Sequence, residues 1–323
     1  MPVKIAYLAK ARPDLKDLIP QDIEHVVVQA GAGGVYGQED LERVADADAF
    51  VISMEPVNEQ ILAACPQVKI AQRLGVGYET MDLRAAAKRG VPCCNVPGVN
   101  KEAVAEHGMT LILALVRRIL ESDRLTRDMK WSEARILTGD TFELYGKTIG
   151  IVGLGNTGFN LAKRARAFGM RVVYNDIREI EPERIEAVGA QFMSKEDLYQ
   201  EADIVSVNTD LNDQSRNMID ARALELMGPR KTLVCCARGG IIDEQALADA
   251  LNAGRLRAAG IDVFAEEPVH KDNPLLTARN CIVTAHVAGV TDETTRRIFE
   301  WAHDNVRAVV ERGEKPKWVL NGV

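Results

Sequence analysis

Short apolar runs alternate with amphipathic helical patterns along the whole chain of 323 residues. Such runs are typical of strands in a parallel sheet, and the helical segments between them are typical of its crossovers. The first third of the chain predicts strands at Val3–Leu8, Glu24–Val28, Ala49–Ile52, Val68–Ala71 and Val91–Cys94. A second series predicts strands at Thr148–Val152, Arg171–Tyr174, Asp203–Val207, Thr232–Cys235, Ala258–Ile261 and Ile282–Thr284. The pattern therefore predicts an α/β protein with two doubly wound parallel sheets.

A turn at residues 96–100 separates the two series. Asn100 is placed to cap a long helix that continues past Arg118. Apolar residues recur at helical spacing over 298–309, which predicts a last helix that packs back on the first domain. The predicted domains are residues 1–98 with 291–323, and residues 99–290.

Length and charge narrow the classes of function. The chain is longer than one hydrophobic core usually supports, so two domains with a cleft between them are expected. A net charge of -7 with scattered Lys and Arg gives no support for binding to nucleic acid or to anionic membranes. The N-terminus lacks a signal-peptide pattern, and the longest apolar run, Met109–Val116, is too short to span a bilayer. The six cysteines show no zinc-binding spacing, so we expect a cytoplasmic protein with reduced thiols and no metal.

A glycine motif follows the first strand of the second series. Gly153, Gly155 and Gly158 form G-x-G-x-x-G between a buried strand and a helical pattern. The first glycine permits a tight turn, the second lets the backbone approach a pyrophosphate, and the third lets the helix pack against the strand. Asn156 and Thr157 open that helix, whose N-terminus is expected to face the phosphates.

An acidic residue ends the next strand. Asp176 lies 18 positions beyond Gly158, where a carboxylate binds the hydroxyls of the adenosine ribose. Because a carboxylate repels a 2′-phosphate, the cofactor is expected to be NAD rather than NADP, although Arg178 lies close enough to weaken that preference. A second glycine-rich run, Gly31–Gly37, has Tyr36 in place of the third glycine and is interpreted as a surface loop.

Reduction of a ketone by hydride transfer requires a cation for the substrate, an acid for the new alkoxide and a group that orients this acid. His286 follows an apolar strand, and Arg238 and Glu267 each follow another strand, so all three belong to the carboxyl edge of a parallel sheet. The other histidines have structural explanations: His25 starts a strand, His107 and His303 lie in helices, and His270 lies in a polar loop.

These residues resemble the D-isomer-specific 2-hydroxyacid dehydrogenase family over essentially the whole chain. The resemblance is carried by Arg73–Gly77 with Asp82, Asn95–Gly98, Ala103–His107, the glycine motif, Ala237–Gly240, Asp262–Phe264, Glu267–Pro268, and His286 before Ala288–Gly289. It implies a Rossmann-type NAD domain (99–290), a flavodoxin-like substrate domain (1–98 and 291–323), and a homodimer formed through the long helix after Asn100.

The resemblance also implies a role for each catalytic residue. Arg238 binds the substrate carboxylate and polarises the keto oxygen, and His286 is the general acid in reduction and the general base in oxidation. Glu267 is chosen over Glu266 as the partner of His286 because it directly precedes the proline; a carboxylate there favours the imidazolium and orients the ring.

Further contacts are implied with the cofactor and the substrate. Besides the glycine motif and Asp176, the implied cofactor contacts are Asp210, Ala237, Arg238, Asp262 and His286. The backbone N–H groups of Leu74, Gly75, Val76 and Gly77 are implied to hold the substrate carboxylate when the cleft closes. The sequence departs from the family pattern at Ala285, Cys235 and Asp210, which we expect to affect cofactor affinity.

Glu55 bears on whether the substrate carries a phosphate. Glu55 stands where relatives acting on 3-phosphoglycerate usually have a basic residue, and its charge would repel a phosphate. The prediction is therefore a small unphosphorylated substrate such as glyoxylate or hydroxypyruvate. 3-Phosphoglycerate stays open, because Arg73 or a partner subunit can supply positive charge. A nucleotide-sensing protein like the corepressors that resemble this family, and an S-adenosylmethionine enzyme with no use for His286 or Arg238, are the alternatives from other classes.

Overall fold

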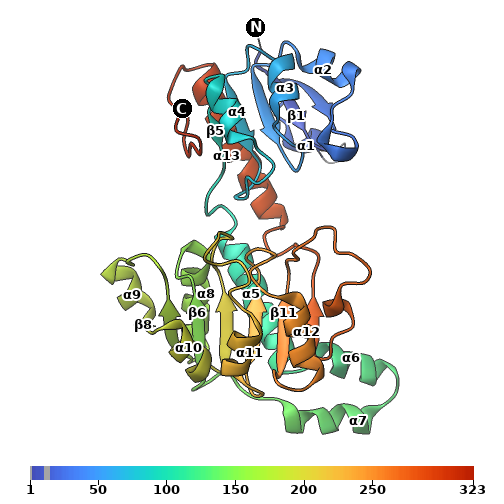
Figure 1. Ribbon diagram of the computed structural model, residues 1–323, viewed down its shortest axis with the longest axis vertical. Helices are drawn as coiled ribbons and strands as arrows, with labels where there is room; N and C mark the ends of the chain where they lie inside the picture. Colours follow the sequence, from blue (N-terminus) through green and yellow to red (C-terminus); the bar gives the residue numbers. More distant parts are fainter. Residues whose placement is uncertain (1, 11–14) are drawn as a thin grey trace. The chain divides into compact units, whose positions relative to one another are not determined.

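The computed structural model describes residues 2–10 and 15–323. The chain folds as two compact units, Met1–Asn100 with Thr291–Val323, and Lys101–Val290 (Figure 1). Sequence placed the first boundary two residues earlier, between 98 and 99, and the second boundary at the same position. Both units are α/β, and every strand pair within each sheet is parallel, as predicted.

The first unit has a five-stranded sheet in the order β2-β1-β3-β4-β5, which is the flavodoxin-like order. Its strands are β1 (Lys4–Leu8), β2 (Glu24–Val28), β3 (Ala49–Ile52), β4 (Ile70–Arg73) and β5 (Cys93–Cys94). Its helices are α1 (Leu15–Leu18), α2 (Gln38–Val44), α3 (Glu59–Ala64), α4 (Leu83–Lys88) and α13 (Asp292–Val310), with a 3-10 turn at Ala32–Gly34.

Alternate residues of β1 enter two separate cores. Ile5 and Tyr7 pack with Phe299 and Val306 of α13, whereas Ala6 and Leu8 belong to the cluster on the side of α2 to α4. Both faces of the sheet are therefore buried, which explains why its strands appear in the sequence as continuous apolar runs.

The second unit has a seven-stranded sheet in the order β12-β11-β10-β9-β6-β7-β8. Its strands are β6 (Thr148–Val152), β7 (Arg171–Asn175), β8 (Gln191–Phe192), β9 (Ile204–Val207), β10 (Thr232–Cys235), β11 (Ala258–Ile261) and β12 (Cys281–Val283). Its helices are α5 (Lys101–Val116), α6 (Ile119–Arg127), α7 (Trp131–Ile136), α8 (Asn156–Ala167), α9 (Pro182–Val188), α10 (Lys195–Glu201), α11 (Ala221–Met227) and α12 (Glu244–Asn252), with 3-10 turns at Leu137–Asp140 and Pro274–Leu276. The strand order reverses beside β6, which is where the Rossmann fold binds a dinucleotide.

Two predictions about this unit were wrong. The single long helix past Arg118 is two helices, because Arg118 adopts a left-handed conformation (φ 51°) between α5 and α6. Strand β8 was missed because it has only two residues, both exposed, and so shows no apolar run. Among the described residues, no helix has the length and hydropathy needed to cross a bilayer, and no three His, Cys, Asp or Glu side chains are grouped as metal ligands.

A buried hydrogen bond joins the sheet of the first unit to α13. The hydroxyl of Tyr7 lies 2.6 Å from Nε2 of His303, whose residue is only 6% exposed. Burial lowers the pKa of His303 to about 4. The folded unit therefore holds this imidazole neutral under conditions where an unfolded chain protonates it.

This difference predicts an acid-sensitive stability. Between pH 6.5 and 4 the unfolded chain binds a proton that folded His303 does not, so the free energy of unfolding falls as the pH drops through this window. We expect His303 to account for a loss of about 2 kcal/mol between pH 7 and pH 5. Urea denaturation of wild type and His303→Gln at both pH values measures it, and an equal loss in the two proteins would show that His303 is not the source.

Candidate active site

The glycine loop leaves the start of α8 open. The N-cap residue of α8 is Gly155, which has no side chain to accept from the first turn. By contrast, α10, α11 and α12 are capped by Ser194, Asp220 and Asp243. Uncapped N–H groups at a helix start form a site for a phosphate, so this loop fits the pyrophosphate of a dinucleotide.

Close packing explains the last glycine of the motif. A Cβ atom on Gly158 would lie 2.1 Å from the carbonyl oxygen of Gly153, so only glycine lets α8 start this close to β6. Arg184 supports the loop from α9 by donating to the carbonyl of Gly155 at 3.1 Å. Contacts within the protein thus hold the loop in this conformation.

Asp176 follows the end of β7, beside the glycine loop. Its Oδ2 accepts from the backbone N–H of Leu154 at 2.8 Å, and its Oδ1 accepts from the backbone N–H of Arg178 at 3.0 Å. Burial alone raises the pKa of this carboxyl, but the hydrogen bonds from Arg178 outweigh burial and bring the pKa below its ordinary value. The carboxylate is therefore charged at neutral pH. Asp210, exposed after β9, adds a second negative charge that acts on Arg178.

His286 and Glu267 form a hydrogen-bonded pair at the carboxyl edge of the sheet. Nδ1 of His286 lies 2.7 Å from Oε2 of Glu267, and Oε1 of Glu267 accepts from the N–H of Phe264 at 3.0 Å. The side chain of His286 is 47% exposed and its backbone is left-handed (φ 53°). A carboxylate can only accept, so Nδ1 of His286 donates its hydrogen to Glu267, and Nε2 is the nitrogen through which this ring can exchange a proton with a ligand.

Arg238 lies on the neighbouring loop after β10. It is half-buried, and its Nη1 donates to the carbonyl of Ala237 at 2.8 Å. A Cβ on Gly239 would lie 1.7 Å from the carbonyl oxygen of Phe264, so glycine is required for this loop to lie against the loop that carries Glu267. Of the departures from the family pattern, Cys235 is fully buried and Ala285 is exposed.

The structure also shows how the His286 loop is held. The Asp262 side chain is completely buried and accepts from the Thr284 hydroxyl at 2.6 Å and from the N–H groups of Val287 at 3.0 Å and Ala288 at 2.9 Å. Its carbonyl accepts from the N–H of His286 at 2.8 Å. A cofactor contact for Asp262 stays a prediction, because protein groups already occupy its carboxylate.

His107 and Thr284 are the residues that sequence reasoning missed. Nε2 of His107, on α5, lies 3.1 Å from the Thr284 hydroxyl and 3.7 Å from Asp262. Two signals were available: Thr284 stands two residues before His286, and His107 ends the segment Ala103–His107 that carries part of the family resemblance. The helical pattern alone does not distinguish His107 from a structural histidine.

The loop at Leu74–Gly77 belongs to the first unit and follows β4. Its carbonyls accept hydrogen bonds from within the unit: Gly75 from Val96 N–H at 3.1 Å, Val76 from Asn95 Nδ2 at 2.8 Å, and Gly77 from Arg73 Nε at 2.8 Å. Within residues 2–10 and 15–323, the N–H groups of Gly75, Val76 and Gly77 have no acceptor, which is the arrangement of a small anion site. Leu74, which was also predicted to bind the substrate carboxylate through its N–H, does not fit this role, because that N–H donates to the carbonyl of Ile52 at 2.7 Å.

Glu55 has a structural contact in the same unit. It is 8% exposed, and its Oε2 accepts from the backbone N–H of Ala30 at 3.1 Å. The predicted repulsion of a phosphate therefore comes from a largely buried charge.

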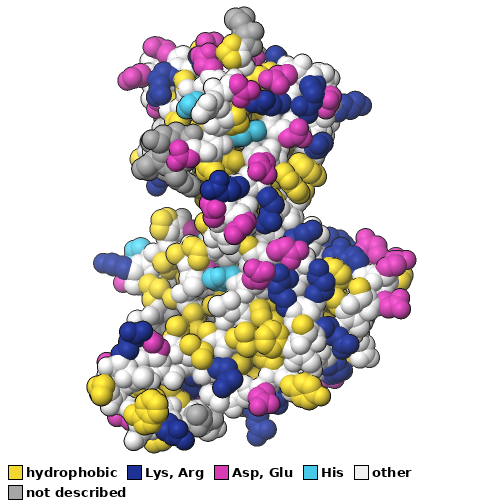
Figure 2. All heavy atoms as spheres, turned by 180° about the vertical axis from the view of Figure 1, so that it is seen from behind, with side chains coloured by type: hydrophobic (Ala, Val, Ile, Leu, Met, Phe, Trp, Pro, Cys, Tyr) yellow, Lys and Arg dark blue, Asp and Glu magenta, His cyan; other side chains and the backbone are white. Residues whose placement is uncertain are grey.

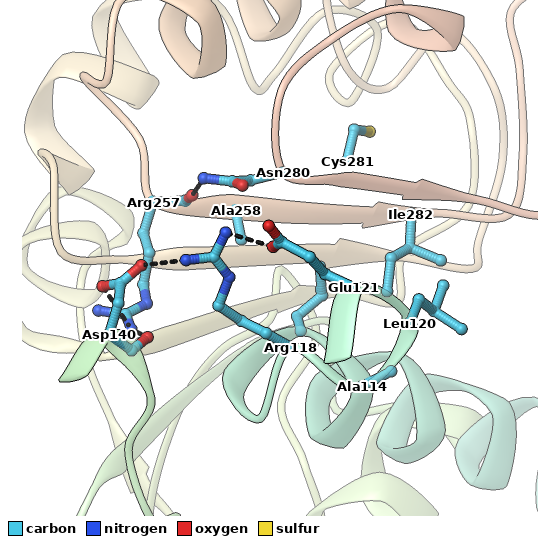
Figure 3. A pocket seen from close by; sticks show the side chains of 11 residues that line it. Ala114, Arg118, Leu120, Glu121, Asp140, Arg257, Ala258, Asn280, Cys281 and Ile282 are labelled. Atoms are coloured by element: carbon cyan, nitrogen blue, oxygen red, sulfur yellow. Dashed lines mark hydrogen bonds and ion pairs between the residues drawn. The ribbon is translucent and has the colours of Figure 1, made fainter. Parts of the chain in front are cut away.

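A cavity of about 230 Å³ lies at the opposite edge of the second sheet (Figure 3). Its lining includes Ala258 and Cys281, which begin β11 and β12, whereas Glu267 and His286 follow the other ends of these strands. Arg118 and Arg257 both pair with Asp140 at its rim. The cavity therefore has no part in the candidate active site.

A comparison with known families decides the classification. Residues 109–288 match the family described as D-isomer specific 2-hydroxyacid dehydrogenase, NAD binding domain. The chain belongs to this family. It is therefore an oxidoreductase that acts on the CH–OH group of 2-hydroxy acids with a nicotinamide dinucleotide.

Individual members of the 2-hydroxyacid dehydrogenase family agree with this. A glyoxylate reductase of Korarchaeum cryptofilum is 37% identical over 87% of this chain and 85% of that protein. A D-3-phosphoglycerate dehydrogenase of Methanocaldococcus jannaschii is 35% identical over 94% of this chain but only 58% of that protein. The NADPH-dependent glyoxylate/hydroxypyruvate reductase of Sinorhizobium meliloti, solved with NADP and malonate, has a TM-score of 0.82 and 26% identity over 99% of this chain and 97% of that one.

Proposed function

We propose that this dehydrogenase reduces a small unphosphorylated 2-keto acid, such as glyoxylate or hydroxypyruvate, to the D-2-hydroxy acid with NADH, and runs the reverse oxidation with NAD. The observation that carries the proposal is the His286–Glu267 pair, 2.7 Å apart, beside the loop of Arg238 and on the same sheet edge as the glycine loop.

A nicotinamide dinucleotide held at the glycine loop and Asp176 would supply the hydride for C2 in reduction and accept it in oxidation. Arg238 then has two roles: its guanidinium pairs with the substrate carboxylate, and its positive charge stabilises the negative charge that grows on the keto oxygen. Nε2 of His286 donates a proton to that oxygen in reduction and removes it in oxidation. The Glu267 carboxylate compensates the charge of the imidazolium and keeps its ring turned so that Nε2 faces the substrate.

The N–H groups of Gly75, Val76 and Gly77 are proposed to hold the substrate carboxylate from the first unit. Three consecutive N–H groups suit a carboxylate better than a neutral group, and the carbonyls of the same three residues are already bonded within the unit.

Relatives of both kinds match this chain: glyoxylate reductases at 36 to 37% identity over 87% of it, and D-3-phosphoglycerate dehydrogenases at 35 to 39% identity over 83 to 94% of it. The feature that favours an unphosphorylated substrate is Glu55, an acidic residue after β3, where relatives acting on 3-phosphoglycerate usually have a basic one. D-3-Phosphoglycerate is the second candidate, because those relatives are of similar identity.

A substrate panel tests the proposal. Glyoxylate, hydroxypyruvate, pyruvate and 3-phosphohydroxypyruvate are each offered with NADH, and the loss of absorbance at 340 nm is followed. We expect the highest kcat/KM with glyoxylate or hydroxypyruvate. A preference for the phosphorylated acid would establish the second candidate, and tight NADH binding with no turnover of any acid would indicate a nucleotide-sensing protein instead.

We further propose that NAD is preferred over NADP, because Asp176 follows β7 at the position where a carboxylate binds the ribose hydroxyls and repels a 2′-phosphate. Its side chain is 4% exposed and pairs with the Arg178 guanidinium at 3.2 Å. Asp176→Ser is expected to raise the ratio of kcat/KM for NADPH to that for NADH by about 10- to 100-fold, since repulsion is removed while Arg178 remains. Glu181→Gln is the matched control, because Glu181 also acts on Arg178 through its charge but lies outside the ribose site. An unchanged ratio in Asp176→Ser would contradict the assignment.

The surface of α6 and α7 supports a homodimer. Helix α7 has no buried residue, although it carries Trp131 and Ile136. More than half of each of several apolar side chains is exposed along this segment: Ile119, Leu120, Met129, Trp131 and Ile136. Figure 2 shows hydrophobic side chains gathered on this part of the second unit, at the lower left. Such a patch is typical of a protein interface, and light scattering that gives the mass of a monomer would exclude the dimer.

A cytoplasmic location is proposed on the cysteines. All six are free thiols, and burial raises the pKa of Cys65 and Cys235 to about 11. Unreactive reduced thiols fit a reducing compartment.

A further inference from the structure

A chain of buried polar side chains leads from α13 to the loop at Gly75–Gly77. Asn305 on α13 and Gln72 on β4 are both fully buried. Nδ2 of Asn305 donates to Oε1 of Gln72 at 2.7 Å, and Nε2 of Gln72 donates to the carbonyls of Arg73 at 3.0 Å and Asn95 at 3.3 Å. Asn95 in turn donates from Nδ2 to the carbonyl of Val76 at 2.8 Å.

The other end of this chain is fixed to the C-terminal segment. Oδ1 of Asn305 accepts from the N–H of Lys317 at 2.8 Å, and Nδ2 also donates to the Lys317 carbonyl at 3.2 Å. The N–H of Asn95 donates to the carbonyl of Trp318 at 3.4 Å. The two amide side chains thus have partners on both sides, and removal of either leaves buried groups without hydrogen bonds.

Packing alone does not require amides at these positions. Strand β4 is buried along its whole length, and Ile70 and Ala71 fill it with apolar side chains. An apolar side chain of similar volume would pack there without the cost of burying polar groups. What the amide of Gln72 provides, and an apolar side chain cannot, is the pair of hydrogen bonds to the backbone carbonyls of Arg73 and Asn95. The side chain of Asn95 in turn donates from Nδ2 to the carbonyl of Val76.

We propose that Gln72 and Asn305 are positioning residues for the substrate: they keep the carbonyls of the Gly75–Gly77 loop turned inward and its N–H groups turned outward. The inference rests on the proposed function, in which these N–H groups bind the substrate carboxylate. Neither side chain touches the substrate.

This role has a distinct kinetic signature. The substrate carboxylate carries the same charge in the bound keto acid and in the transition state, so a displaced loop weakens binding of both equally. Gln72→Met and Asn305→Leu are each expected to raise KM for the keto acid by about 5- to 20-fold with kcat within about twofold of wild type. The double variant is expected to match the worse single variant, because both interrupt the same chain of hydrogen bonds.

Tyr7→Phe is the matched control. It removes another buried hydrogen bond between the sheet and α13, that of Tyr7 with His303, without touching the loop. We expect it to lower the urea midpoint to a similar extent with an unchanged KM. If Gln72→Met and Asn305→Leu also keep the wild-type KM, the pair serves only stability and the proposal is wrong.

Hydrogen exchange of the Val96 amide separates this proposal from the proposed reaction. This N–H bonds to the carbonyl of Gly75, and its exchange needs neither substrate nor cofactor. Exchange at least tenfold faster in Gln72→Met and Asn305→Leu, but not in Tyr7→Phe, supports positioning even if the wild-type enzyme reduces none of the acids tested. Unchanged exchange in all three variants overturns it.

Discussion

Replacing His286 with glutamine is expected to lower kcat for keto-acid reduction by about 10³-fold. Glutamine keeps a polar group near Glu267 but has no proton that it can transfer to the alkoxide at neutral pH. The Kd for NADH is expected to stay within about twofold, because glutamine keeps a polar side chain at the implied cofactor contact of His286, and the glycine loop and Asp176 follow other strands, β6 and β7. Stopped-flow single turnovers and fluorescence titration with NADH measure the two quantities.

His270→Gln is the matched control for this change. Nδ1 of His270 also lies near a carboxylate, 3.5 Å from Oδ2 of Asp272, but both side chains are exposed in a polar loop. Its replacement should therefore leave kcat unchanged. Retention of more than a tenth of wild-type kcat in His286→Gln would assign the proton transfer to another group. Glu267→Gln distinguishes orientation from proton transfer, because it keeps the shape and removes the charge, and a loss of about 10- to 100-fold is expected.

The dinucleotide half of the site could be predicted from sequence because its physical requirements are local. A tight turn, a helix start and an acid after the next strand all lie within one strand-helix-strand unit, and the structure places Gly153, Gly158 and Asp176 accordingly. The grouping of Arg238, Glu267 and His286 was predictable for a related reason. They follow the neighbouring parallel strands β10, β11 and β12, which all end at the same edge of the sheet.

The remaining features depend on contacts between segments far apart in the chain. The bond from His107 to Thr284 spans 177 positions and that from Asn305 to Gln72 spans 233, and no periodicity within a segment indicates either. The break between α5 and α6 depends on the left-handed backbone of Arg118, a residue type that gives no signal for it. Sequence therefore indicated Glu267 as the partner of His286, but not the buried contacts made by His107, Gln72 and Asn305.

The Asp262 side chain shows how strongly that support is expected to matter. Asp262→Ala leaves the hydroxyl of Thr284 and the N–H groups of Val287 and Ala288 without their buried acceptor. Because each of these three buried donors costs about 1–3 kcal/mol when unsatisfied, we expect the free energy of unfolding to fall by about 3–5 kcal/mol. Since the Val287 and Ala288 bonds hold the left-handed turn at His286, kcat is expected to fall by at least about 100-fold in the protein that still folds.

Asp262→Asn keeps the prediction testable if the alanine variant does not fold. An amide oxygen can still accept from one backbone N–H, but the NH₂ group faces a donor, so a loss of about 1–3 kcal/mol is expected together with a lower kcat. Asp220→Ala is the matched control, because Asp220 also accepts from a backbone N–H in this unit, at the start of α11 and away from the His286 loop. Its expected cost is about 1 kcal/mol with kcat unchanged. Equal kcat in Asp262→Asn and Asp220→Ala would show that the carboxylate stabilises the unit without setting the position of His286.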